Sequence, residues 1–144
     1  MVVPQDHIRV VERLAQNLFI CSPHVSQVAA LEAMSCEDEL TKNLNIYRKN
    51  RQIIIDGLKH IGLQSFAPPD GAFYFYVDIS KYSDDSLLFC NDILQEVGVA
   101  ITPGVDFDPA RGKTTIRISY ARSTDEITEG IEKLGDFMKK RGYF

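Results

Sequence analysis

No stretch of this chain approaches the roughly 18–20 consecutive apolar residues that a membrane-spanning helix requires. The opening run MVVPQDHIRVVERL brings in charge at once, unlike a secretory signal peptide. The formal net charge is -4, and the densest basic run, residues 139–141, falls at the end of an expected helix, where the helix dipole favours it. No stripe of Lys and Arg of the kind that binds nucleic acid is present. We therefore expect neither a membrane nor a nucleic acid as a partner.

Cysteine and histidine are also sparse. The three cysteines, Cys21, Cys36 and Cys90, form no CxxC pair, which favours a reduced, cytoplasmic protein in which each is a small buried residue. The three histidines are scattered, so no spacing predicts a metal site. P-loop, GxSxG, HExxH and Rossmann glycine motifs are all missing, which excludes the functions that those motifs indicate.

The pattern of apolar residues predicts an α/β chain. Helical spacing covers residues 5–18 and about 28–34, with a break at 21–27, and a long helix then runs from about residue 36 to Gly62. The elements expected after it are a strand at 72–79, a helix at about 84–97, a short strand at 99–102, a loop at 103–112, a strand at 114–121 and a closing helix from Ser123. This order predicts a short sheet with helices packed against it, preceded by a long helix. The first 35 residues are typical of the tail of a larger fold.

Two of these elements carry a further prediction, one about burial and one about a helix cap. The strand at 72–79 is apolar or aromatic on both faces, which predicts a strand inside a sheet that is covered on both sides. The helix at 84–97 is expected to be capped by Ser83 or Asp84 and ended by Gly98, and it carries Leu87, Leu88, Asn91, Leu94 and Val97.

Arg117 is the first candidate for a binding residue. In the strand TTIRISYA, alternation places Ile116, Ile118 and Tyr120 on a core face and Arg117 with Ser119 on the other. A guanidinium held by a rigid strand can bind a carboxylate through two parallel hydrogen bonds. The alternative is a solvated face on which Arg117 keeps an edge strand soluble.

Two other segments hold weaker candidates. The loop PGVDFDPARG is expected to need Gly104 and Gly112 for its turns, and its pair Asp106 and Asp108 indicates turn chemistry more than a metal or an acid pair. The aromatic run at 73–76 could line a ligand pocket, although at least two of the four rings are expected in the core.

In combination and order, the segments resemble the class I/II aminotransferases, which are pyridoxal-phosphate enzymes of fold type I similar to aspartate aminotransferase. The segments that carry the resemblance are MVVP followed by a helix, LAQNLFICSPHVSQVAALEAM (14–34), YRKNRQIIIDGL (47–58), PPDGAFYFYVDIS (68–80), VGVAITPGVDFDP (97–109) and TTIRISYARS (114–123). Together they cover nearly the whole chain. The resemblance implies that residues 1–35 are the incomplete tail of the large cofactor-binding domain. Residues 36–144 are then the C-terminal small domain, including the long interdomain helix.

The resemblance also implies roles for particular residues. Arg117 matches the arginine that grips the substrate's α-carboxylate, and Phe73 matches an aromatic residue near the substrate. The segment 21–24 resembles one that reaches the partner subunit's active site in the family's dimers. The implied partners are an amino acid, a 2-oxo acid and a second copy of the chain, and the implied cofactor is pyridoxal phosphate. Which amino acid is the donor does not follow from these residues.

One departure from the family pattern limits the expected activity. The family places its Schiff-base lysine a short way before a glycine-tryptophan-arginine stretch that directly precedes the MVVP-like segment, and no lysine of this chain matches that motif. Neither a catalytic nor a cofactor-binding residue is therefore assigned, and we expect the 144 residues alone to be inactive and to hold no cofactor covalently. The alternatives are another fold-type-I enzyme such as a β-lyase, a non-catalytic ligand-binding or regulatory module, or, less well supported, a small amino-acid-binding domain.

Overall fold

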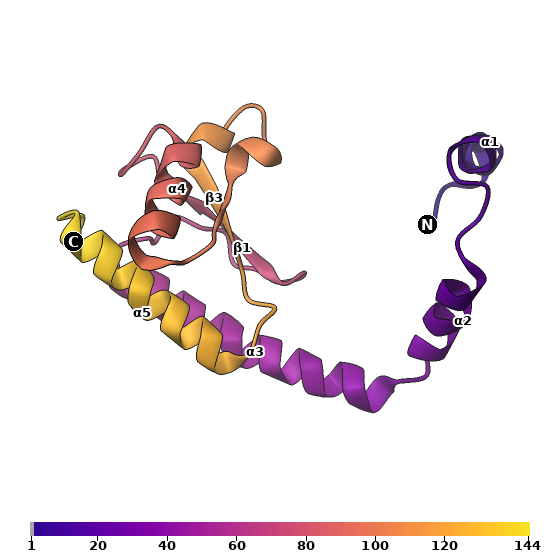
Figure 1. Ribbon diagram of the computed structural model, residues 1–144, viewed down its shortest axis with the longest axis horizontal. Coiled ribbons are helices and arrows are strands. Elements are labelled where there is room, and N and C mark those ends of the chain that lie inside the picture. Colours follow the sequence, from indigo (N-terminus) through magenta and orange to yellow (C-terminus); the bar gives the residue numbers. More distant parts are fainter. Residues whose placement is uncertain (1) are drawn as a thin grey trace. The chain divides into compact units, whose positions relative to one another are not determined.

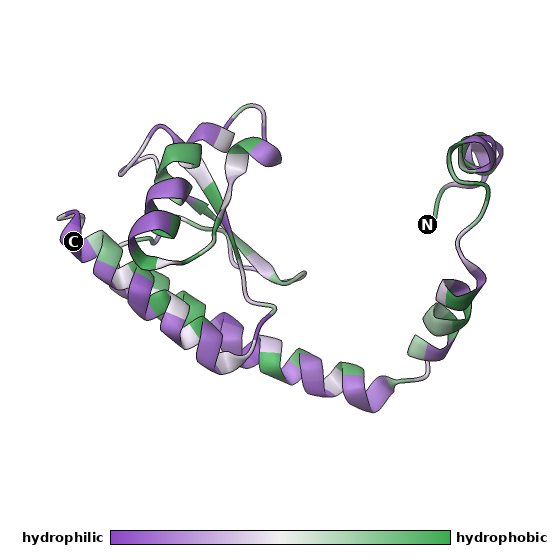
Figure 2. Ribbon diagram, viewed as in Figure 1, coloured by the Kyte–Doolittle hydropathy of each residue, from purple (hydrophilic) through white to green (hydrophobic). Residues whose placement is uncertain are grey.

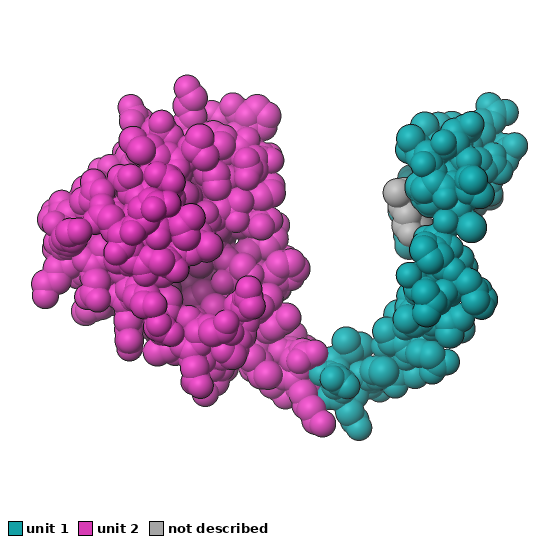
Figure 3. All heavy atoms as spheres, viewed as in Figure 1, with its two compact units in different colours: residues 1–41 teal, residues 42–144 magenta. Residues whose placement is uncertain are grey.

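The computed structural model describes residues 2–144 and divides the chain into two compact units, residues 1–41 and 42–144 (Figure 1; Figure 3). The first unit is helical, as predicted: a 3-10 turn, η1 (Gln5–His7), leads into α1 (Ile8–Leu18), and α2 (His24–Ala33) follows. Helix α2 begins earlier than residue 28 because Pro23 stands at its N-cap, with a ψ of 138°, and so precedes the helix instead of interrupting it.

No described side chain of the first unit is buried. Figure 2 shows hydrophobic residues along α1 and α2, and the large apolar side chains exposed over residues 8–34 are Ile8, Val10, Leu14, Leu18, Phe19, Ile20, Val25, Val28, Leu31 and Met34. Cys21 and Cys36 are exposed as well, so the prediction that every cysteine is buried is wrong for these two. It is confirmed for Cys90, where burial and the nearby Asp106 carboxylate raise the pKa of the thiol to about 12.

Helix α3 (Glu37–His60) begins in the first unit and continues into the second. The remaining elements, in chain order, are β1 (Tyr74–Asp78), α4 (Ser86–Val97), β2 (Thr102–Pro103), the 3-10 turns η2 (Gly104–Asp106) and η3 (Gly112–Thr114), β3 (Thr115–Ser119) and α5 (Thr124–Lys140). Strand β3 is central in a three-stranded antiparallel sheet of order β1-β3-β2. The predicted order of helices and strands is confirmed.

One apolar core joins the sheet to the helices of the second unit. The sheet contributes Phe75, Val77, Ile116 and Ile118, and the helices contribute Ile54, Leu58, Phe89, Ile93, Leu134, Phe137 and Met138. The strand residues alternate in sequence, so they share one face of the sheet. The polar residues between them, including Arg117, therefore lie on the opposite face.

Strand β1 corrects the prediction of a strand covered on both sides. It lies at an edge of the sheet, where its outer side makes a single bridge between Val77 and Phe66. Phe75 and Val77 are fully buried, whereas Tyr74 on the other face is 38% exposed. The prediction was wrong because it took aromatic residues on both faces as a sign of burial on both faces. A tyrosine is compatible with a half-exposed face as well as with a buried one.

Helix α4 buries only part of its apolar surface, and its N-cap differs from the predicted one. Leu87, Leu88 and Leu94 are exposed, whereas Phe89 and Ile93, one helical turn apart, enter the core. Asp85, not Ser83 or Asp84, caps the helix by accepting a hydrogen bond from the backbone N–H of Leu88. Because apolar residues surround much of this helix, their spacing alone does not distinguish the buried face.

Helix α5 follows the prediction more closely. Ser123 and Glu126 form the capping box, and hydrogen bonds from the Ser123 side chain and backbone lower the pKa of Glu126. At the other end, Lys140 and Arg141 bind Glu96 of α4, and these hydrogen bonds lower the pKa of that carboxyl. Within residues 2–144, no helix is long and apolar enough to cross a membrane.

Candidate functional site

Arg117 stands in the middle of the central strand. Its cross-strand partners are Tyr76 on β1 and Thr102 on β2, so the backbone is held from both sides. Ile116 and Ile118 are buried on the opposite face, as the alternation predicted. The interpretation of Arg117 as a solubilising edge residue is wrong, because β3 is not an edge strand.

The Arg117 guanidinium lies against two aromatic rings. Its Cζ is 4.4 Å from the ring centroid of Phe107 and 5.5 Å from that of Tyr74, both within the range of a cation–π contact. Phe107 comes from the loop between β2 and β3, and Tyr74 begins β1. Three separate segments therefore meet at this one charge.

Arg117 also lacks a polar partner among the described residues 2–144. Its Nε is buried without a hydrogen bond, and no carboxylate lies within ion-pair distance of its guanidinium. Leaving such a donor unsatisfied costs about 1–3 kcal/mol. A cation held on a rigid strand, stacked on apolar rings and left with a free donor is suited to bind an anionic group from outside the second unit.

The loop that carries Phe107 is fixed by backbone contacts. A Cβ on Gly104 would meet the Thr115 side chain and stand 2.6 Å from its carbonyl oxygen, and a Cβ on Gly112 would stand 2.6 Å from the Gly104 backbone. Both glycines are thus required by close approach rather than by the turn conformations that the sequence suggested. The hydroxyl of Thr115 donates to that of Tyr76 at 2.7 Å, which ties the end of the loop to β1.

One of the two aspartates of this loop, Asp108, behaves as a turn residue. Asp108 accepts hydrogen bonds from the backbone N–H groups of Arg111 and Ala110, which lower the pKa of its carboxyl, and it also pairs with the Arg111 side chain at 3.1 Å. Asp106 is exposed. Among the described residues, no group of three or more potential ligands could hold a metal ion. For Asp108, the prediction of turn chemistry is confirmed.

Phe73 lies just before β1 and is 47% exposed. Its ring meets that of Tyr74 edge to face at 5.9 Å, and Tyr74 rather than Phe73 is the β1 ring beside Arg117. The substrate contact implied for Phe73 stays a prediction, as does the reach of segment 21–24 toward a partner subunit. Sequence reasoning missed Tyr74 and Phe107 as neighbours of Arg117. The even spacing of Tyr74 and Tyr76 could have revealed Tyr74, but no pattern indicated Phe107.

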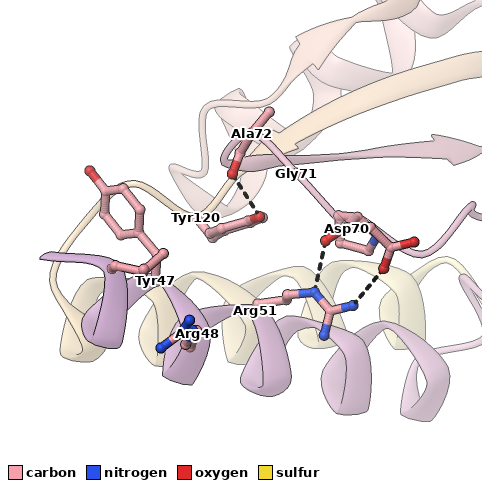
Figure 4. Close-up of a pocket in the computed structure, with 9 residues that line it drawn as sticks. Tyr47, Arg48, Arg51, Asp70, Gly71, Ala72 and Tyr120 are labelled. Carbon is pink, nitrogen blue, oxygen red and sulfur yellow. Dashed lines mark hydrogen bonds and ion pairs between the residues drawn. The ribbon is translucent and has the colours of Figure 1, made fainter. Parts of the chain in front are cut away.

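A cleft of about 430 Å³ opens beside the start of β1, between α3 and the loop at residues 69–72 (Figure 4). Its lining residues are Leu44, Tyr47, Arg48, Arg51, Pro69, Asp70, Gly71, Ala72 and Tyr120. Ala72 has a φ of 56°, in the left-handed region that a residue with a side chain seldom adopts. Such a conformation costs on the order of 1–2 kcal/mol and persists only where surrounding contacts hold it.

Comparison with known proteins shows the family of this chain. The sequence profile of aminotransferase class I and II matches residues 2–134. Valine–pyruvate aminotransferase of Mycobacterium tuberculosis is 44% identical over 140 residues, which are 96% of this chain and 36% of that protein. The chain thus spans a little over a third of such relatives.

Solved structures show the same likeness. A Silicibacter pomeroyi protein superimposes with a TM-score of 0.88 at 55% identity, over 98% of this chain and 38% of that one. A Methanococcus jannaschii protein, whose active site is similar to those of kynurenine aminotransferases, superimposes with a TM-score of 0.77 at 33% identity. The match covers 95% of this chain and 36% of that one. The match falls on the C-terminal portion of these proteins, which confirms the predicted fold class. The chain belongs to the class I and II aminotransferase family.

Proposed function

We propose that this chain is the C-terminal part of a pyridoxal-phosphate-dependent aminotransferase, and that Arg117 binds the substrate's α-carboxylate. The enzyme moves an amino group between an amino acid and a 2-oxo acid. The family supports the reaction class. The single observation that supports the role of Arg117 is its buried Nε, which has no partner within residues 2–144.

The residues described here fit the substrate end of such a site. An unpaired guanidinium on a central strand suits a carboxylate, whereas no lysine of the chain matches the family's Schiff-base motif. Pyridoxal phosphate, when bound, supplies the electron sink that stabilises charge at Cα. We expect the segments that hold it to lie outside these 144 residues, so the chain alone should show no amino-group transfer.

Arg117 orients the substrate through its hydrogen bonds. Phe107 lies against the guanidinium, and a carboxylate that approaches in the guanidinium plane can accept two parallel hydrogen bonds from its nitrogens. Such a pair fixes both the position and the rotation of the carboxylate. The Cα bonds of the amino acid are then held in one orientation for the reaction.

The whole protein is proposed to work as a homodimer in the cytoplasm, with an amino acid and a 2-oxo acid as its substrates. The name of the M. tuberculosis relative makes valine and pyruvate the first pair to test. A dimer peak in light scattering of the full-length protein is expected. A monomer that transfers amino groups at full rate would contradict the dimer.

The test uses the full-length protein, loaded with pyridoxal phosphate, in a screen of amino donors against 2-oxo acids. We expect transfer by the native protein and a loss of about 10- to 100-fold in kcat/KM for Arg117→Lys, because lysine keeps the charge but loses the paired hydrogen bonds. Arg122→Lys is the matched control, since that side chain is 73% exposed and pairs only with Glu126.

Three outcomes would contradict the proposal. Elimination products without amino-group transfer would indicate a β-lyase or a related enzyme. Ligand binding without any turnover would indicate a binding or regulatory module. Equal kcat/KM values for the native protein and Arg117→Lys would remove the role of Arg117 while leaving the reaction class intact.

A further inference from the structure

Two adjacent polar residues of α3, Asn50 and Arg51, hold the segment that leaves β3 and the segment that enters β1. Asn50 is fully buried, and its Nδ2 donates to the carbonyl oxygens of Tyr120 at 3.1 Å and Arg122 at 2.8 Å. These carbonyls belong to the turn by which the chain leaves β3. A side chain of α3 thus fixes the exit of the strand that carries Arg117.

Arg51 holds the segment that enters β1. Its Nε donates to the carbonyl oxygen of Pro69 at 2.9 Å, and a terminal nitrogen lies 3.6 Å from the carboxylate of Asp70 (Figure 4). The Arg51 side chain is 32% exposed and forms a wall of the cleft beside α3.

Tyr120 ties the two held segments together. Its hydroxyl donates to the carbonyl oxygen of Ala72 at 3.1 Å, and its backbone N–H donates to that of Phe73 at 2.8 Å. These bonds hold Ala72 in its left-handed conformation. The next residue after Phe73 is Tyr74, whose ring lies beside the Arg117 guanidinium.

We propose that Asn50 and Arg51 form a clamp, the α3 clamp, that positions Arg117 and Tyr74 for binding the substrate carboxylate. The inference rests on the proposed function, because it assigns to α3 a role at the site of Arg117. The clamp residues are positioning residues, since neither is given a contact with substrate. Arg51 acts through Pro69, Ala72 and Phe73 on Tyr74, and Asn50 acts through Tyr120 on β3.

The polar character of the clamp supports positioning over simple packing. Asn50 is fully buried and keeps its Oδ1 without a hydrogen bond, a cost that is offset by the two hydrogen bonds its Nδ2 donates to the carbonyls of Tyr120 and Arg122. Arg51 bonds to a backbone carbonyl of an otherwise exposed loop. Directional bonds of this kind fix a backbone position, which apolar contacts do not.

The experiment compares Arg51→Gln, Asn50→Leu and Tyr120→Phe in the full-length protein loaded with pyridoxal phosphate. Propanoate, a carboxylate without an amino group, serves as a competitive probe of the Arg117 site. We expect KM for the amino acid and Ki for propanoate to rise together, by about three- to tenfold for each variant, the factor that corresponds to one hydrogen bond. The value of kcat at saturation is expected to change less than twofold.

Arg48→Gln is the matched control. Arg48 lies three residues before Arg51, lines the same cleft and carries the same charge, but its side chain bonds only to Asn45. We expect its KM and Ki to equal those of the native protein. A second control combines Arg51→Gln with Arg117→Lys, where the losses should be less than additive because the clamp acts through Arg117.

The outcomes separate the clamp from the proposed function. If Arg117→Lys leaves the Ki of propanoate unchanged, the proposed role of Arg117 fails and the clamp fails with it. If Arg117→Lys weakens propanoate but the folded clamp variants lower only the melting temperature, the clamp alone is refuted. Should Arg51→Gln not fold, Tyr120→Phe and Asp70→Ala decide, since each removes a single side-chain contact of the same arrangement.

Discussion

The two units of this chain use apolar residues in opposite ways. Residues 2–41 contain two helices rich in apolar side chains, and none of these side chains is buried. Residues 42–144 bury a continuous core under three helices and a sheet. The difference shows that helical periodicity identifies the apolar face of a helix. It does not show which residues pack against that face. The second unit has a buried apolar core that can stabilise its fold, whereas the helices of the first unit expose their apolar side chains.

The largest expected difference between the units is in the free energy of unfolding lost when one apolar side chain is truncated to alanine. Phe75→Ala should lower the free energy of unfolding by about 3–5 kcal/mol, because the ring is fully buried and packs edge to face on Phe66 and Tyr120. Leu14→Ala in α1 is the control, with an expected change below about 0.5 kcal/mol. Urea denaturation of the 144-residue chain measures the free energy of unfolding of both variants. Equal losses in the two would contradict the difference between the units.

A smaller effect is expected where the second unit brings two backbone segments together. Gly104→Ala should destabilise by about 1–3 kcal/mol, since the added Cβ meets the backbone of Thr115 and Gly112. Gly130→Ala on α5 has open space at the same atom and should be neutral or stabilising. Thermal unfolding of the two variants tests the difference. A stable Gly104→Ala chain would show that the loop approaches less closely than described.

Acid should weaken the second unit selectively. The pKa values of Glu96, Asp108 and Glu126 are lowered in the folded chain by hydrogen bonds, and all three residues belong to residues 42–144. A lowered folded pKa contributes stability that is present above the unfolded value and is lost as pH falls through the folded value. Unfolding free energy should therefore decline below about pH 4.5. Glu96→Gln should flatten that decline, and an unchanged slope would argue against the pair with Arg141.

The smallest expected free energies are those of local opening in the first unit. Amide hydrogens of α1 and α2 should exchange within seconds in the 144-residue chain, because no buried contact opposes opening. Those of β3 and α5 should be protected to the level of global unfolding. Hydrogen exchange monitored by mass spectrometry measures the exchange rates of both sets of amides in one experiment. Slow exchange of the α1 amides in a monomeric chain would contradict this expectation, because it would show that the apolar face of α1 is buried.

Much of the fold was predictable because local rules decide it. The alternation in TTIRISYA placed Ile116 and Ile118 in the core and Arg117 opposite them, and Ser123 with Glu126 marked the start of α5. The buried face of α4 was not predictable, since its leucines and its Phe89 and Ile93 lie on different sides of an apolar helix. Only packing against α5 and the sheet selects one of them.

The candidate site was predictable only in part. Arg117 followed from its strand and from the family resemblance. Phe107 did not, because it precedes Arg117 by ten positions and lies in the loop before β3, and their contact depends on the close approach of Gly104 and Gly112. The α3 clamp was equally hidden, since the contacts of Asn50 join residues 70 and 72 positions apart. Short-range patterns carry no information about such contacts.

The role of Arg117 as the carboxylate-binding residue is tested most directly by comparing two substrates of the full-length, cofactor-loaded protein. One is the preferred amino acid, and the other is the amine that lacks only its carboxylate. We predict that Arg117→Lys lowers kcat/KM for the amino acid by about 10- to 100-fold and leaves that for the amine within twofold. Equal losses for the two substrates, or no loss for the amino acid, would contradict the role of Arg117.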